Sequence, residues 1–142
     1  MDNAAILRRW FEEVWNQGRE ETIDELLAPD AVGHDLGGAG QAHIGPAAFK
    51  PFWSQLRGAF PDIRFSIEDV VAEGDRVAAR WTATMTHRGD GLGIAATHKS
   101  LTLTGMIFLR IEGGRIREGW NNWDQLLLTR ELGLPVSSEI GR

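Results

Sequence analysis

The residues best suited to chemistry lie near the end of the last predicted strand, residues 115–124. Side chains along a strand alternate between its two faces. The alternation predicts two sets: Ile116, Glu118, Trp120, Asn122 and Asp124 on one face, and Arg117, Gly119, Asn121 and Trp123 on the other. Each set joins a large indole to polar groups, so either face suits a binding pocket and the choice between them stays open.

Asp124 is the strongest candidate for acid/base catalysis on this strand. Trp120 lies four residues earlier on the same predicted face, so both side chains can line one cavity. A carboxylate beside indole rings loses hydration and becomes a better proton acceptor near neutral pH. The alternative is that Asp124 is exposed at the strand end or begins the following turn. Burial of this carboxylate therefore separates an enzyme from a simple binding module.

Two histidines at predicted strand ends are candidates for an assisting role. His34 belongs to a short extended segment, residues 31–36, and His87 ends the predicted strand 77–87. A neutral imidazole at such a position donates a hydrogen bond to a carbonyl oxygen or orients Asp124. The alternative for each is a surface or capping histidine.

The remaining histidines fall in predicted loops. Four glycines in residues 37–45 predict a loop without a stable element, and His43 lies within it. His98 lies in a second glycine-bearing linker, residues 88–100. We expect both side chains to be exposed to solvent.

Other catalytic chemistries lack their sequence signatures. The chain has no cysteine, which excludes a thiolate nucleophile and Cys-ligated zinc or iron–sulfur sites. No HxH or HExxH spacing is present, so we expect no metal site. No GxSxG motif positions a serine nucleophile, and the glycines of residues 89–93 lack the spacing of a dinucleotide site.

The elements that must position these residues follow from the spacing of apolar side chains, which is helical up to residue 59 and alternating from residue 63 onward. Helices are predicted over residues 3–15, 20–27 and 46–59, and strands over residues 63–71, 77–87, 101–112 and 115–124. Pro51 is expected to kink the third helix or delay its regular part. Residues 126–134 form either a short helix or an extended segment. This order predicts an α+β fold, a curved antiparallel sheet with helices packed on one face.

Composition limits the possible partners and locations. The 142 residues suit one domain, with a core over about residues 4–134 and a frayed tail over residues 135–142. The net charge of −5 and only two lysines argue against nucleic-acid binding. No apolar run reaches the length of a membrane span, and the N-terminus lacks the pattern of a signal peptide. We therefore expect a cytoplasmic location and no membrane partner.

Several short motifs together resemble one known family. They are His34-Asp35, Phe60-Pro61-Asp62, Glu73-Gly74-Asp75-Arg76-Val77, Arg80-Trp81, Thr86-His87-Arg88-Gly89, Gly113-Gly114-Arg115-Ile116 and Glu118-Gly119-Trp120…Asp124. From about Ala5 to Gly133 the chain resembles the SnoaL-like polyketide cyclases of the nuclear transport factor 2-like superfamily. The resemblance implies a cone of curved antiparallel sheet, with three N-terminal helices packed on its concave face around one deep pocket.

The resemblance also implies an activity and the residues that perform it. In such cyclases an aspartate on the last long strand is the acid/base for intramolecular aldol ring closure, and that role falls on Asp124. His34 and His87 match the assisting histidines, and the reaction needs no metal or organic cofactor. The substrate is expected to be a small apolar or aromatic carbonyl compound. The residues expected to contact it are Trp120, Trp81, Trp53, Asn122, Met85 and Phe49.

Other activities remain open on the same fold. An isomerase or dehydratase of the ketosteroid isomerase type also needs one pocket aspartate. An epoxide hydrolase would use an arginine with two carboxylates, for which Arg80 and Glu118 are available. The protein is otherwise a non-catalytic module that binds a small apolar ligand. A homodimer is expected, because an open curved sheet leaves one face to cover.

Overall fold

The computed structural model describes residues 2–34 and 42–134 of the chain. Its helices are α1 (Asn3–Arg9), η1 (Trp10–Asn16), α2 (Glu20–Leu26), α3 (Gly45–Ala59) and α4 (Gln125–Leu132). Its strands are β1 (Leu27–His34), β2 (His43–Ile44), β3 (Arg64–Glu73), β4 (Arg76–Thr86), β5 (Ser100–Glu112) and β6 (Arg115–Trp123). The predicted tail, residues 135–142, lies outside the described residues, as do residues 35–41 of the predicted glycine-rich loop.

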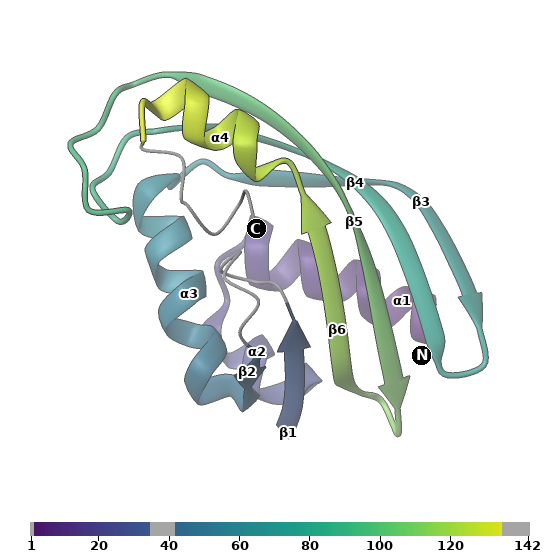
Figure 1. Ribbon diagram of the computed structural model, residues 1–142. Helices are drawn as coiled ribbons and strands as arrows, with labels where there is room; N and C mark the ends of the chain where they lie inside the picture. Colours follow the sequence, from purple (N-terminus) through teal and green to yellow (C-terminus); the bar gives the residue numbers. More distant parts are fainter. Residues whose placement is uncertain (1, 35–41, 135–142) are drawn as a thin grey trace.

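One six-stranded sheet, in the order β2-β1-β6-β5-β4-β3, curves over the N-terminal helices (Figure 1). Strands β3 to β6 pair antiparallel with their neighbours in sequence, as the predicted antiparallel sheet requires. β1 departs from the all-antiparallel expectation, because it pairs parallel with β6. The α+β fold with helices on the concave face of a curved sheet is confirmed.

The first helix contains a π-helical segment that the apolar stripe did not predict. Asp2 caps α1, since its carboxylate accepts the Ala5 amide at 2.8 Å. From Trp10 the helix widens into η1, in which backbone hydrogen bonds span five residues. Residues five apart then lie one above the other, so Trp10 and Trp15 both face the core. Both indoles pack against Phe49 of α3, with ring centroids 5.1 and 6.0 Å away.

The third helix runs without interruption from Gly45 to Ala59, so the expectation that Pro51 delays its regular part is wrong. Pro51 and Ala47, the residue whose carbonyl loses a helical partner, are both exposed. Water can therefore satisfy that carbonyl, which removes most of the cost of an interior proline.

Residues 126–134, left open as a helix or an extended segment, contain a fourth helix. α4 lies across the end of β5 and β6 (Figure 1). Asp124 caps its first turn, and Gly133 ends it in the left-handed conformation with φ of 70°. In the part of the chain that the structure describes, no helix has the length and apolar character needed to cross a bilayer.

A bulge between β5 and β6 decides which side chains enter the core. Ile111 pairs with Ile116, whereas the preceding Arg110 pairs with Glu118, so β6 carries one extra residue, Arg117. An extra residue exchanges the two faces of a strand beyond that point. The inward side chains of β6 are consequently those of Ile116, Gly119, Asn121 and Trp123.

Candidate active site

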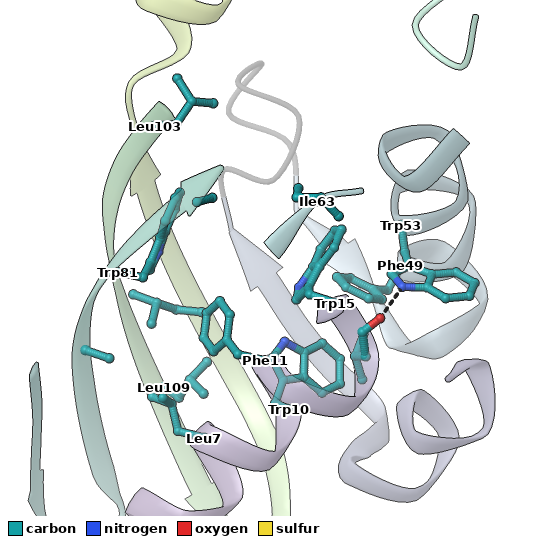
Figure 2. Close-up of a cluster of buried hydrophobic side chains, with 14 of the residues drawn as sticks. Leu7, Trp10, Phe11, Trp15, Phe49, Trp53, Ile63, Trp81, Leu103 and Leu109 are labelled. Atoms are coloured by element: carbon teal, nitrogen blue, oxygen red, sulfur yellow. Dashed lines mark hydrogen bonds between the residues drawn. The ribbon is translucent and has the colours of Figure 1, made fainter. Parts of the chain in front are cut away.

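An apolar cavity lies between the concave face of the sheet and the helices. Its larger part, the first chamber, measures about 640 Å³ when its open mouth is included. Figure 2 shows Trp81 facing it from β4, opposite Phe11, Trp10 and Trp15 of η1. The first chamber is lined by Trp10, Phe11, Trp15, Phe49, Phe52, Leu56, Phe60, Ile63, Phe65, Trp81, Ala83, Met85, Leu103, Ile107, Asn121, Trp123 and Leu128.

A second chamber, of about 500 Å³ when its open mouth is included, adjoins the first under β1, β2 and β6. Trp10, Phe49, Ile107 and Asn121 line both chambers and form the boundary between them. The second chamber is otherwise lined by Leu27, Ala31, Val32, Gly33, His43, Gly45, Leu109, Ile116, Gly119 and Trp120.

Asn121 is a polar side chain at the boundary of the two chambers, and Trp81 fixes its orientation. The Trp81 Nε1–H donates to the Asn121 Oδ1 at 3.4 Å. An indole nitrogen can only donate, so the amide oxygen must face it and the amide nitrogen must point elsewhere. The arrangement leaves two N–H donors of Asn121 available to a ligand in a mostly apolar cavity.

The position of Trp81 depends on a glycine in the middle of β5. A Cβ atom on Gly105 would lie 2.3 Å from Trp81 Cζ2 and 2.8 Å from the carbonyl oxygen of Asn122. Gly105 faces inward directly beside Trp81 in the sheet, and its missing side chain lets the indole lie over β5 toward β6. A glycine inside a long strand signals such a close approach.

Asp124 does not occupy the dry position beside Trp120 that its predicted face implied. Its side chain is exposed, and its Oδ1 accepts the Leu127 amide at 3.0 Å as the N-cap of α4. The physical reason is local: β6 ends at Trp123, and the helix that follows needs an acceptor for its free amides. Its catalytic role stays a prediction.

His34 lies on the outer, convex face of the sheet. Its Nε2 is 2.8 Å from Glu118 Oε2, and its ring stacks on Trp120 at 5.1 Å and 15°. The hydrogen bond from His34, with a further contribution from Arg110, lowers the pKa of Glu118 despite some desolvation. The bulge explains this placement, because it turns Trp120 and Glu118 outward.

His87 is completely buried beyond the end of β4, where it holds the following linker. The Thr97 amide donates to His87 Nδ1 at 3.1 Å, so Nδ1 carries a lone pair and the proton lies on Nε2. Nε2 has no hydrogen-bond partner among the described residues, and the ring packs on Phe60 at 5.6 Å. His87 does not line either chamber.

The predicted substrate contacts divide between the two faces of the sheet. Trp81, Met85 and Phe49 line the first chamber, as expected for ligand contacts. Trp53 instead packs behind this wall, where its indole nitrogen donates to the Val14 carbonyl at 2.8 Å (Figure 2). Asn122 faces outward into a shallow groove on the convex face.

Trp120 lines the second chamber but also borders the outer groove, whose other lining residues are Asp69, Val71, Ala78, Ala79, Arg80, Met106, Ile107, Phe108 and Asn122. Arg80 and Glu118, the residues available to an epoxide hydrolase, do not line the inner cavity. Arg80 approaches Asp69 at 3.8 Å, and Glu118 bonds His34. Within residues 2–34 and 42–134, no three His, Asp or Glu side chains gather as potential metal ligands.

His43 is the residue that sequence reasoning missed. It belongs to β2, where it pairs with Gly33, and it lines the second chamber rather than an exposed loop. Its Nδ1 is buried without a hydrogen-bond partner among the described residues. The glycines of the segment predicted a loop instead of this strand. The strand forms through pairing with β1 and not through local propensity.

Nearly the whole chain matches the model of one protein family. The profile of the SnoaL-like polyketide cyclases covers residues 5–132. The chain belongs to the SnoaL-like polyketide cyclase family. No functionally curated protein gives a significant match to the chain.

Solved structures of this SnoaL-like fold are similar over nearly the full chain. IdmH from Streptomyces antibioticus, proposed to be a polyketide cyclase, is 30% identical with a TM-score of 0.82, over 94% of this chain and 100% of that one. A protein from Acidithiobacillus ferrooxidans with the same proposed activity is 30% identical, with a TM-score of 0.77, over 94% and 98%. AclR from Streptomyces galilaeus, proposed to be a hydroxylase, is 26% identical, with a TM-score of 0.78, over 97% and 89%.

Proposed function

We propose that this SnoaL-like protein closes a ring in a polyketide-like carbonyl compound by an intramolecular aldol reaction, without a cofactor. A base removes a proton from a carbon between two carbonyls, and the carbanion attacks another carbonyl carbon of the same molecule. The new alkoxide takes up a proton, so substrate and product contain the same atoms. Family membership supports the cyclase class.

The observation that carries the proposal is the fixed amide of Asn121 inside an aromatic cavity. Negative charge develops on the carbonyl oxygen as the enolate and the alkoxide form. A donor held in place beforehand stabilises that charge strongly where water is excluded. The aromatic walls, among them Trp81 and Phe49, would hold the flexible chain in a folded conformation that brings the reacting carbons together.

The acid/base group in this proposal is Asp124. Asp124 lines neither chamber, but Trp123 before it and Leu128 one turn after it line the first chamber, and this nearness supports the proposed role. Helix capping uses Oδ1, and no described residue bonds Oδ2. Asp124→Asn tests the role cleanly, since asparagine caps helices about as well as aspartate but cannot accept the proton. A loss of turnover at unchanged melting temperature supports the role, and full turnover excludes it.

Turnover of a linear poly-β-ketone presented as its N-acetylcysteamine thioester tests the proposal as a whole. Cyclised product is measured by liquid chromatography and mass spectrometry. Asn121→Leu should lower the rate by about a hundredfold, the usual cost of removing an oxyanion donor. Asn122→Leu is the matched control, because it makes the same change one residue away on the outer face. Equal rates in the two variants would contradict a role for the inner amide.

Binding without turnover is the second candidate function. It is favoured by two observations: Asp124 is exposed, and no Asp or Glu is among the described residues that line the two chambers. A ligand that co-purifies unchanged, with no product from the thioester panel, would support it over catalysis.

We also propose that the protein forms a homodimer through the convex face of its sheet. Val71, Met106 and Phe108 on that face expose 68%, 62% and 41% of their surface around the outer groove. Light scattering after gel filtration should give twice the chain mass, and Phe108→Glu should give a monomer. Leu126→Glu, at an exposed position on α4, is the control. A monomeric wild-type protein would exclude the dimer.

A further inference from the structure

The two chambers of the inner cavity offer different kinds of apolar surface. More than half of the residues around the first chamber are aromatic, among them Trp15, Phe65 and Trp81. The residues that line the second chamber alone include a group of aliphatic side chains, namely Leu27, Ala31, Val32, Leu109 and Ile116. Aromatic rings gain from oriented contact with other rings, whereas a saturated chain gains from apolar burial in any orientation. The first chamber therefore suits a ring system, and the second suits a saturated chain.

The amide of Asn121 lies where the two chambers meet. On the sheet, Asn121 of β6 pairs with Ile107 of β5, and both residues line both chambers. On the side of the helices, the boundary consists of Trp10 and Phe49, whose ring centroids are 5.1 Å apart. A carbonyl group bound to the Asn121 amide therefore has one chamber on each side. Because a ketone carbon carries two substituents, one of them can enter each chamber.

Leu109 limits the length of a chain in the second chamber. The inward position of β6 next to Asn121 is Gly119, two residues and about 7 Å along the strand. Leu109 of β5 pairs with Gly119 and lies over it, since a Cβ atom on Gly119 would be 3.0 Å from Leu109 Cδ2. A chain that starts at a carbonyl on Asn121 therefore meets the Leu109 side chain after about five carbons.

We propose that the second chamber is a subsite for a saturated alkyl arm of the ligand, and that Leu109 determines the length of this arm. The ring system of the ligand occupies the first chamber, its carbonyl oxygen accepts from Asn121, and the arm on the same carbonyl carbon lies in the second chamber. The ligand class is an aryl ketone with an alkyl chain of about five carbons, rather than an aryl methyl ketone. The arm takes no part in bond formation and determines which carbonyl of the ligand reaches Asn121. This inference rests on the proposed role of the inner cavity in carbonyl binding.

A series of 2-naphthyl ketones that differ only in chain length tests the subsite. The methyl, propyl, pentyl and heptyl ketones are 1-(2-naphthyl)ethanone, 1-(2-naphthyl)butan-1-one, 1-(2-naphthyl)hexan-1-one and 1-(2-naphthyl)octan-1-one. Their Kd values are measured on the full chain by tryptophan fluorescence quenching. In the wild type, affinity should rise about fourfold per methylene from methyl to pentyl, the value of one buried CH₂ group, and should not rise further to heptyl. Equal Kd values for the methyl and pentyl ketones, or a heptyl ketone that binds most tightly, would overturn the inference.

Leu109 and Leu103 form a matched pair of positions for substitution. Both lie on β5 and expose 3% of their surface, but Leu109 lines the second chamber alone and Leu103 the first alone. Leu109→Ala should make the heptyl ketone the tightest binder, because a longer chain fills the space that the leucine leaves. Leu103→Ala should leave the pentyl ketone as the tightest binder. The same tightest binder in both variants overturns the assignment of Leu109.

A smaller change tests the subsite where truncation of a core leucine costs too much stability. Ala31 lines the second chamber alone and Ala83 the first alone, and both are buried. Ala31→Val should lower the ratio of the methyl-ketone Kd to the pentyl-ketone Kd by about tenfold, because its two added carbons displace about two methylenes of the chain. Ala83→Val should leave this ratio unchanged. An unchanged ratio in Ala31→Val overturns the inference.

A separate variant, Asn121→Leu, distinguishes failure of the subsite from failure of the proposed function. It should weaken all four ketones by one common factor, because they share the carbonyl group, and keep the gain per methylene. If it weakens all four while the wild type shows no gain with chain length, the inner cavity keeps its proposed role and the alkyl subsite is excluded. If Asn121→Leu changes no Kd, the proposed function fails whatever the chain-length series shows.

Discussion

Substitution of Gly105 by alanine would test the geometry on which the cavity depends. The added Cβ would lie 2.3 Å from Trp81 Cζ2 and 2.7 Å from Trp81 Cε2. The backbone of Gly105 does not have a positive φ, so alanine itself would not be strained there. Trp81 exposes only 3% of its surface. Its indole therefore cannot move without disturbing Phe65, whose ring centroid lies 5.0 Å away. The indole must tilt away from β5, which breaks its hydrogen bond to Asn121.

The magnitude follows from two costs. Overpacking a core costs about 1–3 kcal/mol, and loss of the hydrogen bond costs about 1 kcal/mol more. The expected loss in the free energy of unfolding is therefore about 2–4 kcal/mol. In a chain of this length each kcal/mol lowers Tm by about 3–4 °C, which gives a decrease of about 6–16 °C.

Stability is measured by urea unfolding, and ligand affinity by titration with the aryl dione 1-(2-naphthyl)butane-1,3-dione, followed by tryptophan fluorescence. Gly58→Ala in α3 is the control, because its nearest neighbour would be 3.8 Å away and the change should be neutral or slightly stabilising. Trp81→Phe in the Gly105→Ala background should recover part of the lost stability, since phenylalanine lacks the atoms that clash. A Gly105→Ala protein as stable as the wild type, with unchanged dione affinity, would refute this account of the cavity wall.

Three further predictions concern stability. Asp124→Ala should lower the free energy of unfolding by about 1 kcal/mol in urea unfolding, whereas Asp124→Asn should not, because only alanine removes the helix cap; equal stability would contradict the cap. Hydrogen bonding to Arg9, above all, lowers the pKa of Glu13 in the folded state, so its contribution is complete above the ordinary carboxyl pKa and is lost as the pH falls through the folded-state value. Urea unfolding as a function of pH should show this acid loss in the wild type and less of it in Glu13→Gln, and identical pH profiles would exclude it. Trp53→Phe leaves the Val14 carbonyl without its donor and should cost about 1–3 kcal/mol in calorimetry, a result that an unchanged Tm would rule out.

The sequence predicts the order of elements well because most of the chain follows one period at a time. The alternation of residues 77–87 is borne out in the buried face of β4, from Val77 to Met85. The π-helical segment at Trp10 could not be predicted in the same way. An apolar stripe of closely spaced aromatic residues fits both a helix and its widened form.

The side chains of β6 that face the cavity could not be predicted from alternation, because one bulge residue, Arg117, exchanges the two faces of the strand. Without the bulge, Trp120 would share the inward face with Ile116 as expected; with it, Asn121 replaces Asn122 in the cavity. A bulge is set by pairing with β5, which local sequence does not encode. By contrast, the capping position of Asp124 carried a local signal, an aspartate two residues before the run of leucines from Leu126 to Leu128.

His43 illustrates the same limit at the other end of the sheet. Two residues of edge strand have no period to detect, and only their pairing with β1 turns the imidazole inward. The inner polar groups of the site, Asn121 and His43, are thus both products of strand pairing. The apolar walls, which repeat along helices and strands, were accessible from the sequence.

The most direct test of the inner site is the carbonyl stretching frequency of bound 1-(2-naphthyl)butan-1-one labelled with ¹³C at the carbonyl, recorded by infrared difference spectroscopy. A hydrogen bond from the Asn121 amide weakens the C=O bond and lowers this frequency. The account predicts the same lowered frequency in the wild type and in Asn122→Leu, and a higher one in Asn121→Leu. One frequency shared by all three proteins would contradict it.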